Sequence, residues 1–98
     1  MSGMFVPASE AVREKLDWGS LAWCCRPAGT GAKRLVVIEV TLAPGGGHAF
    51  HCHPQQEEVI YAIEGEVEQW LDQQKRTLGP GDCVFIPGGT VHASFNTT

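Results

Sequence analysis

Short hydrophobic runs separated by glycine and proline dominate the chain. Runs rich in β-branched, aromatic and other apolar residues cover positions 21–25, 34–42, 58–63, 66–71, 84–86 and 91–95. Glycine and proline cluster between them at 27–31, 44–47, 79–81 and 87–89, and Glu64-Gly65 is expected to form a tight turn. Many short strands joined by such turns are typical of an antiparallel sandwich or barrel. The pattern therefore predicts an all-β fold.

The segment 8–18 departs from this pattern. Its apolar residues Ala8, Val12 and Leu16 recur every four positions, and Ser9 stands where a helix N-cap would lie. This spacing predicts one short N-terminal helix.

Length and charge narrow the function classes. The chain has 98 residues, enough for one domain. Its 7 basic and 11 acidic residues give a net charge of −4, which argues against a nucleic-acid partner because phosphate binding depends on clustered positive charge. The basic pair Lys75-Arg76 is expected to lie in a solvated turn.

Targeting signals and cysteine usage point to the cytoplasm. No apolar run approaches the ~20 residues that span a bilayer, and residues 1–7 lack the basic start and long apolar run of a signal peptide. We therefore expect a cytoplasmic protein with no membrane partner. The four cysteines show no C-x-x-C spacing and are expected to be reduced and mostly buried thiols.

The candidate chemistry lies in a histidine pair and the residues that follow it. In a strand, His51 and His53 project to the same face, since residues two apart share a face. Either Glu57 or Glu58 supplies a carboxylate at the mouth of the next strand, and His92 follows a Gly-rich turn far downstream. Imidazoles with one carboxylate suit a divalent metal such as Fe, Mn, Ni, Cu or Zn.

Spacing alone leaves other interpretations open. A His-x-His pair on a strand also fits ordinary surface or core histidines, and the added carboxylate and third histidine shift the balance toward a metal site. Strand alternation places His48 with Phe50 and Cys52, away from the pair, so we expect His48 on the exposed surface. By the same alternation Tyr61 lies opposite Glu58 and is expected to pack.

Two motifs in the second half of the chain resemble those of a known family. The first reads G-x5-H-x-H-x4-E-x6-G and is formed by Gly45, His51, His53, Glu58 and Gly65. The second reads G-x5-P-x-G-x2-H-x3-N and is formed by Gly81, Pro87, Gly89, His92 and Asn96. Both resemble the signature motifs of the cupin superfamily, complete and in order. The short spacer 66–80 is similar to that of small microbial, single-domain cupins of the cupin 2 type.

The resemblance implies a fold and a ligand set. The fold is a double-stranded β-helix, the jelly-roll-like barrel also called RmlC-like, here with residues 1–98 as a single domain. Carried over by position, the metal ligands are His51, His53, Glu58 and His92, and the motif spacing selects Glu58 over Glu57. Asn96 is expected to stabilise the end of the barrel without binding the metal.

The ends of the chain add two expectations. Residues 1–20 are expected to form an N-terminal extension that packs on the barrel. Cupin barrels usually continue after the motif asparagine with one or more closing strands, whereas this sequence stops at Thr98. Either the barrel is short, or a partner subunit supplies the missing edge, or the chain is truncated. Since an unpaired edge favours association, we expect a homodimer that covers it.

The resemblance implies a function only by class. The first hypothesis is a metal-dependent enzyme acting on a small organic substrate, of dioxygenase, isomerase or decarboxylase type. The alternative is a non-catalytic module that binds a sugar-like or anionic small molecule and keeps the metal for structure. Polar residues expected near the ligands are few: Ser94, Gln69 and Thr41. The catalytic residues and the substrate are left open, because function depends on the site and not the fold.

Overall fold

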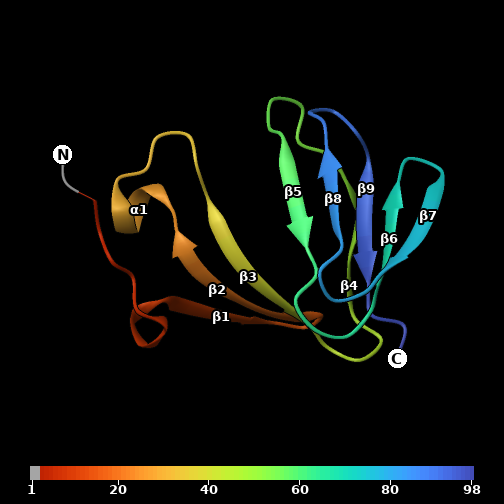
Figure 1. Ribbon diagram of the computed structural model, residues 1–98, viewed down its shortest axis with the longest axis horizontal. Helices are drawn as coiled ribbons and strands as arrows, with labels where there is room; N and C mark the ends of the chain where they lie inside the picture. Colours follow the sequence, from red (N-terminus) through yellow and green to blue (C-terminus); the bar gives the residue numbers. More distant parts are fainter. Residues whose placement is uncertain (1–2) are drawn as a thin grey trace. The chain divides into compact units, whose positions relative to one another are not determined.

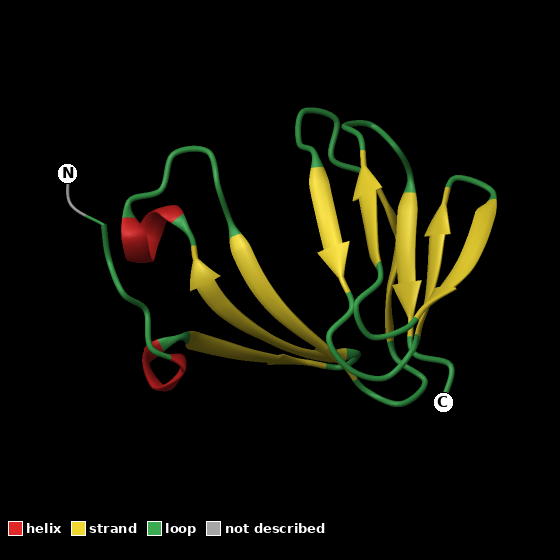
Figure 2. Cartoon of the chain, viewed as in Figure 1, coloured by secondary structure: helices red, strands yellow, loops and turns green. Residues whose placement is uncertain are grey.

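A computed structural model describes residues 3–98 of the chain. By contacts the chain divides into two compact units, Met1–Thr41 and Leu42–Thr98. Strands are the main regular elements of both units, and the helical segments η1 (Ala8–Glu10) and α1 (Pro27–Thr30) are single turns (Figure 2). The predicted all-β class is confirmed.

The first unit contains a three-stranded sheet in the order β1-β2-β3 (Figure 1). Its strands are β1 (Val12–Leu16), β2 (Gly19–Cys25) and β3 (Val37–Leu42). β1 and β2 form a tight antiparallel hairpin in which Val12 faces Trp23. The Trp23 indole Nε1 donates to the Glu14 carboxylate at 3.4 Å, which links the two strands through their side chains.

The predicted helix over 8–18 is wrong. Only Ala8–Glu10 is helical, as one 3-10 turn, and Val12–Leu16 is the strand β1. A repeat of four residues fits one helical turn, but it equally fits two alternations of a strand. Pairing of β1 with β2 decides between them, and this long-range contact cannot be read from residues 8–18 alone.

The second unit consists of two antiparallel sheets. One has the order β4-β9-β6-β7 and the other the order β5-β8. The strands are β4 (Gly47–His51), β5 (Glu58–Tyr61), β6 (Val67–Leu71), β7 (Gln74–Leu78), β8 (Cys83–Ile86) and β9 (His92–Phe95). The chain crosses between the sheets after β4, β5, β7 and β8, so each sheet is built from segments far apart in the sequence (Figure 1).

The buried interior of the second unit is small. Ile86 and His92 are its largest fully buried side chains, and Leu78, Ala93 and Gln69 are also buried. A histidine at 1% exposure is unusual in such a core, because burying a polar group costs free energy unless that group has a partner.

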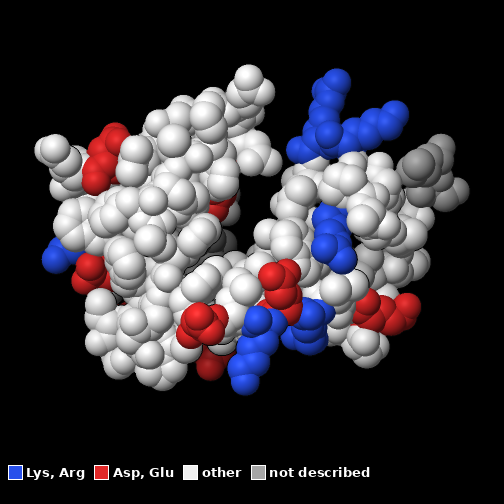
Figure 3. All heavy atoms as spheres, turned by 180° about the vertical axis from the view of Figure 1, so that it is seen from behind, with Lys and Arg blue, Asp and Glu red and all other residues white. Residues whose placement is uncertain are grey.

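Lys75 and Arg76 lie in β7 and not in a turn, so that expectation is wrong. They face Trp70 and Gln69 of β6, and the Lys75 ammonium lies 5.5 Å from the centre of the Trp70 ring. On the face shown in Figure 3, basic side chains form separate groups among acidic and uncharged residues. Within the described residues, no helix has the length and hydropathy needed to cross a membrane.

Asn96 ties the end of the second unit to its beginning. Its backbone N–H donates to the Gly46 carbonyl at 2.8 Å, and its side-chain Nδ2 donates to the Leu42 carbonyl at 3.1 Å. Its Oδ1 accepts from the backbone N–H and the hydroxyl of Thr98. Asn96 therefore has the stabilising position expected from the sequence.

We expect Asn96→Ala to lower the free energy of unfolding by about 1–2 kcal/mol, because it removes a side-chain hydrogen bond and leaves the Leu42 carbonyl without this donor. Thr97→Ala, at an exposed neighbouring position, is the matched control and should change stability by less than about 0.5 kcal/mol. Urea unfolding of the two variants checks this, and equal stabilities would contradict the role given to Asn96.

The expected single-domain organisation, the packing of residues 1–20 on the barrel and the homodimer stay predictions.

The expectation of reduced, mostly buried cysteines is correct in one respect only. All four cysteines are free, but Cys52 and Cys83 are exposed and Cys24 and Cys25 are half-buried. Small strands with little core leave these thiols near the surface, so the expected burial is wrong.

Candidate metal centre

Three elements of the second unit bring four side chains together. His51 is the last residue of β4, Glu58 the first of β5 and His92 the first of β9, and His53 follows β4 in the loop. His51 and His92 face each other across the β4–β9 pair. The ends of strands therefore position three of the four groups, and rigid elements hold such groups better than loops do.

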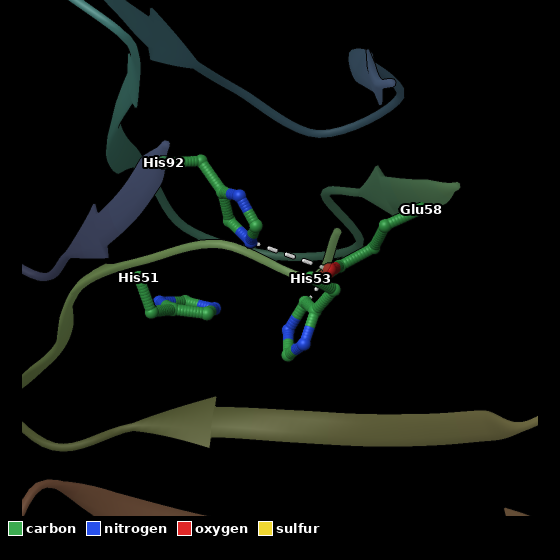
Figure 4. Close-up of side chains that lie close together, drawn as sticks. All are labelled: His51, His53, Glu58 and His92. Carbon is green, nitrogen blue, oxygen red and sulfur yellow. Dashed lines mark ion pairs between the residues drawn. The ribbon is translucent and has the colours of Figure 1, made fainter. Parts of the chain in front are cut away.

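The four side chains point toward one another (Figure 4). Each offers one ligand atom, and these atoms all lie within 4.8 Å of one another. The Glu58 carboxylate lies 3.3 Å from Nε2 of His92 and 3.8 Å from Nε2 of His53. The rings of His51 and His92 are 4.1 Å apart at 61°. These four residues could hold one metal ion.

Backbone carbonyls fix the orientation of two of the imidazoles. Nδ1 of His51 lies 2.7 Å from the Ala49 carbonyl, and Nδ1 of His92 lies 2.9 Å from the Thr90 carbonyl. A carbonyl only accepts, so each Nδ1 must donate, and in the neutral imidazole the lone pair then lies on Nε2. A neutral imidazole whose other nitrogen is held in this way is a ready metal ligand.

The buried nitrogen of His92 tests whether these residues fit a metal. Its Nε2 is buried and makes no hydrogen bond, although the Glu58 oxygen lies only 3.3 Å away. In the neutral ring that contact places a lone pair against a carboxylate oxygen, and a cation bound between the two atoms would relieve the repulsion. The donor set of imidazole and carboxylate therefore fits a divalent cation.

The structure places Glu58, and not Glu57, in the cluster. Glu57 is exposed and belongs to no group of candidate ligands in residues 3–98.

The loop that carries His53 is held by the turn before β9, because the backbone N–H of Gly89 donates to the His53 carbonyl at 3.0 Å. Gly89 has a φ of 82°, a conformation that favours glycine, which explains this motif position.

His48 lies beside the cluster, so the expectation that it points away from the histidine pair is wrong. Its ring is 3.9 Å from that of His51, at 32°. The register changes between these residues, because His48 faces Ser94 while His51 faces His92. Three steps along β4 match two along β9, and this bulge turns His48 to the face that carries His51.

Burial lowers the pKa of His48, and the neighbouring His51, His92 and His53 act in the same direction, while Glu58 raises it. Together these effects favour the neutral form of the ring, and the side chain is exposed as the sequence predicts. No sequence signal marks the bulge, since it depends on pairing with β9. Of the polar residues expected near the ligands, Ser94 and Gln69 lie on strands β9 and β6 of the second unit, whereas Thr41 is an exposed residue of the first unit. Tyr61 is 62% exposed, so it lies on the surface and not in the core.

Comparison with known families decides the identity of this fold. The family model described as the cupin domain matches residues 38–98, more than half of the chain. The chain belongs to the cupin domain family. The jelly-roll-like fold and the family predicted from the two motifs are thereby confirmed.

Curated relatives of this cupin include enzymes. It is 40% identical over 60 residues to quercetin 2,3-dioxygenase of Bacillus subtilis, which covers 61% of this chain and 18% of the relative. It is 39% identical over 61 residues to the dimethylsulfoniopropionate lyase DddQ of Ruegeria pomeroyi, covering 61% of this chain and 30% of the lyase. The cupin thus spans less than a third of the length of either relative.

Solved structures share the fold at low sequence identity. KdgF from Halomonas sp. superposes with a TM-score of 0.86 at 22% identity, over 98% of this cupin and 84% of that chain. A predicted oxalate decarboxylase from Thermotoga maritima gives a TM-score of 0.84 at 23% identity, over 96% and 88%. At this identity the likeness establishes the fold alone.

Proposed function

We propose that this cupin binds one divalent transition metal through His51, His53, Glu58 and His92 and is a metal-dependent enzyme acting on a small organic substrate. The observation that carries the proposal is the buried Nε2 of His92, which has no hydrogen-bond partner and faces the Glu58 carboxylate at 3.3 Å. A bound metal would supply Lewis-acid or redox chemistry at this position.

The residues around that position have different roles in binding the metal. His51 and His92 are held by backbone carbonyls at Nδ1, so their orientation costs little on binding. Glu58 contributes the negative charge that a divalent cation requires, and its side chain is 35% exposed. His53 is 43% exposed, which leaves the cluster open on its side to a small molecule.

The relatives support an enzyme by their activities. Their names describe a dioxygenase and a lyase, and both act on small organic molecules. We propose a reaction of dioxygenase, isomerase or decarboxylase type for this cupin, with Fe, Mn, Ni, Cu or Zn as the metal.

Metal content and affinity test this function. Protein purified without chelator should contain about one equivalent of metal, and Glu58→Gln should weaken metal binding at least about tenfold because it removes an anionic ligand. Glu57→Gln makes the same change of charge at an exposed neighbouring residue and should bind metal as the wild type does. Elemental analysis and competition with a chromogenic chelator provide both measurements.

The reverse pattern would make Glu57 the ligand, and equal affinity in both variants would remove the carboxylate from the site. A screen of small organic acids and enols then tests catalysis, with O2 uptake as the readout for the iron form. Turnover that Glu58→Gln abolishes and Glu57→Gln preserves supports the enzyme. Full metal binding without turnover of any substrate favours the non-catalytic binding module.

A further inference from the structure

A second row of polar side chains lies next to the candidate metal ligands. The register of β4, β9 and β6 aligns His51 with His92 and Leu71, and it aligns His48 with Ser94 and Gln69. His92 and Ser94 are two residues apart on β9, so they share one face of the sheet. The two rows are therefore about 7 Å apart along the strands, on the same face.

The hydrogen bonds of this row have a fixed direction. The Gln69 amide Nε2 donates to the Trp70 carbonyl at 3.2 Å, which leaves its Oε1 as the group that faces Ser94. The Ser94 hydroxyl donates its single proton to that Oε1 at 2.6 Å. Gln69 is 3% exposed, so this amide is held in place by its surroundings.

The direction of these bonds decides what Ser94 can offer. Its proton is committed to Gln69, and its oxygen retains lone pairs that only accept. Ser94 is half-buried, so the residue is not sealed from solvent. The row contains no lysine or arginine, so it offers no permanent positive charge for a carboxylate.

We propose that Ser94, oriented by Gln69, is a specificity-determining residue that accepts a hydrogen bond from a hydroxyl group of the substrate. The substrate class is then a small molecule that binds the metal through an oxygen at one end. It carries an alcohol, enol or phenol hydroxyl about 7 Å from that oxygen. This proposal rests on the proposed function, since the metal-directed end needs the cluster. His48 lies at the β4 end of this row, in contact with the His51 ring, and there it limits the width of the ligand.

Binding of 4-hydroxybenzoate and 4-methoxybenzoate to the metal-loaded chain tests the proposal. Their carboxylates address the metal equally, and their far ends differ because the methyl group removes the donor and keeps the oxygen. We expect the wild type to prefer the hydroxyl compound about five- to tenfold in calorimetric titrations. Ser94→Ala should abolish this preference, while Ser20→Ala, the matched control in β2, should keep it.

A second variant tests the orienting role of the amide. Gln69→Met keeps the length of the side chain but frees the Ser94 hydroxyl to donate as well, so the preference should shrink toward unity. Metal content is measured on every sample. Loss of metal from the wild type would overturn the proposed function itself, whereas intact metal with equal affinity for both compounds, or with no binding of either, would overturn the role of Ser94 alone.

Discussion

His92→Leu is expected to remove the response of the protein to metal without destabilising the metal-free fold. The wild type should gain about 2.7 kcal/mol at a free metal concentration of about 100 times Kd, which raises Tm by about 10–20 °C in a domain of this size. The variant should show no such shift, because the buried Nε2 is absent.

Without metal, His92→Leu is expected to have little effect on the free energy of unfolding. A buried polar atom without a partner costs about 1–3 kcal/mol, and removing it offsets the loss of the Nδ1 hydrogen bond to the Thr90 carbonyl, which contributes about 0.5–1.5 kcal/mol. The metal-free variant should therefore be about as stable as the metal-free wild type. Differential scanning fluorimetry with and without metal measures both effects. A retained metal shift would show that His92 is not a ligand, and a less stable metal-free variant would show that its role is structural.

Gly47→Ala is expected to disrupt the β4–β9 pair. A Cβ at this position would lie 2.6 Å from the Ser94 carbonyl oxygen and 2.9 Å from the Phe95 Cα. Both are backbone atoms that cannot rotate away, so the strands must separate. We expect a loss of about 2–4 kcal/mol in the free energy of unfolding, a large part of the stability of a small domain.

The same separation should also weaken metal binding, because β4 and β9 carry His51 and His92. Gly29→Ala is the matched control, since a Cβ there meets nothing within 4 Å and the residue lies in the helical turn α1. It should change stability by less than about 1 kcal/mol, in the stabilising direction. Denaturant unfolding compares the variants, and equal stabilities would contradict the close approach of β4 and β9.

Much of the fold could be predicted because most of its strands have a signal in their own local sequence. Runs rich in β-branched, aromatic and other apolar residues between glycine and proline turns identify β2, β3, β5, β6, β8 and β9. The strands that were missed, β1 and β7, have mostly polar residues, and β7 reads Gln-Lys-Arg-Thr-Leu. Pairing with a neighbour makes them strands, and charged residues on an edge strand protect it from other chains.

The candidate ligands could be predicted because the motif spacing is a property of the sequence. The position of His48 could not, because it follows from a bulge that only the pairing of β4 with β9 creates. The hydrogen bond from Ser94 to Gln69 likewise joins residues 25 positions apart, so neither residue alone reveals which way the proton points.

The order of the strands has a consequence for how the protein folds. β9 comes last among the described strands, yet it lies between β4 and β6 in the sheet. Until it inserts, β4 and β6 have no common neighbour, and His92 is remote from His51 and Glu58. Such non-local pairing makes folding slow, of order milliseconds to seconds. The complete set of four ligands therefore exists only once β9 has paired with β4 and β6, so a metal bound by all four residues stabilises the finished sheet.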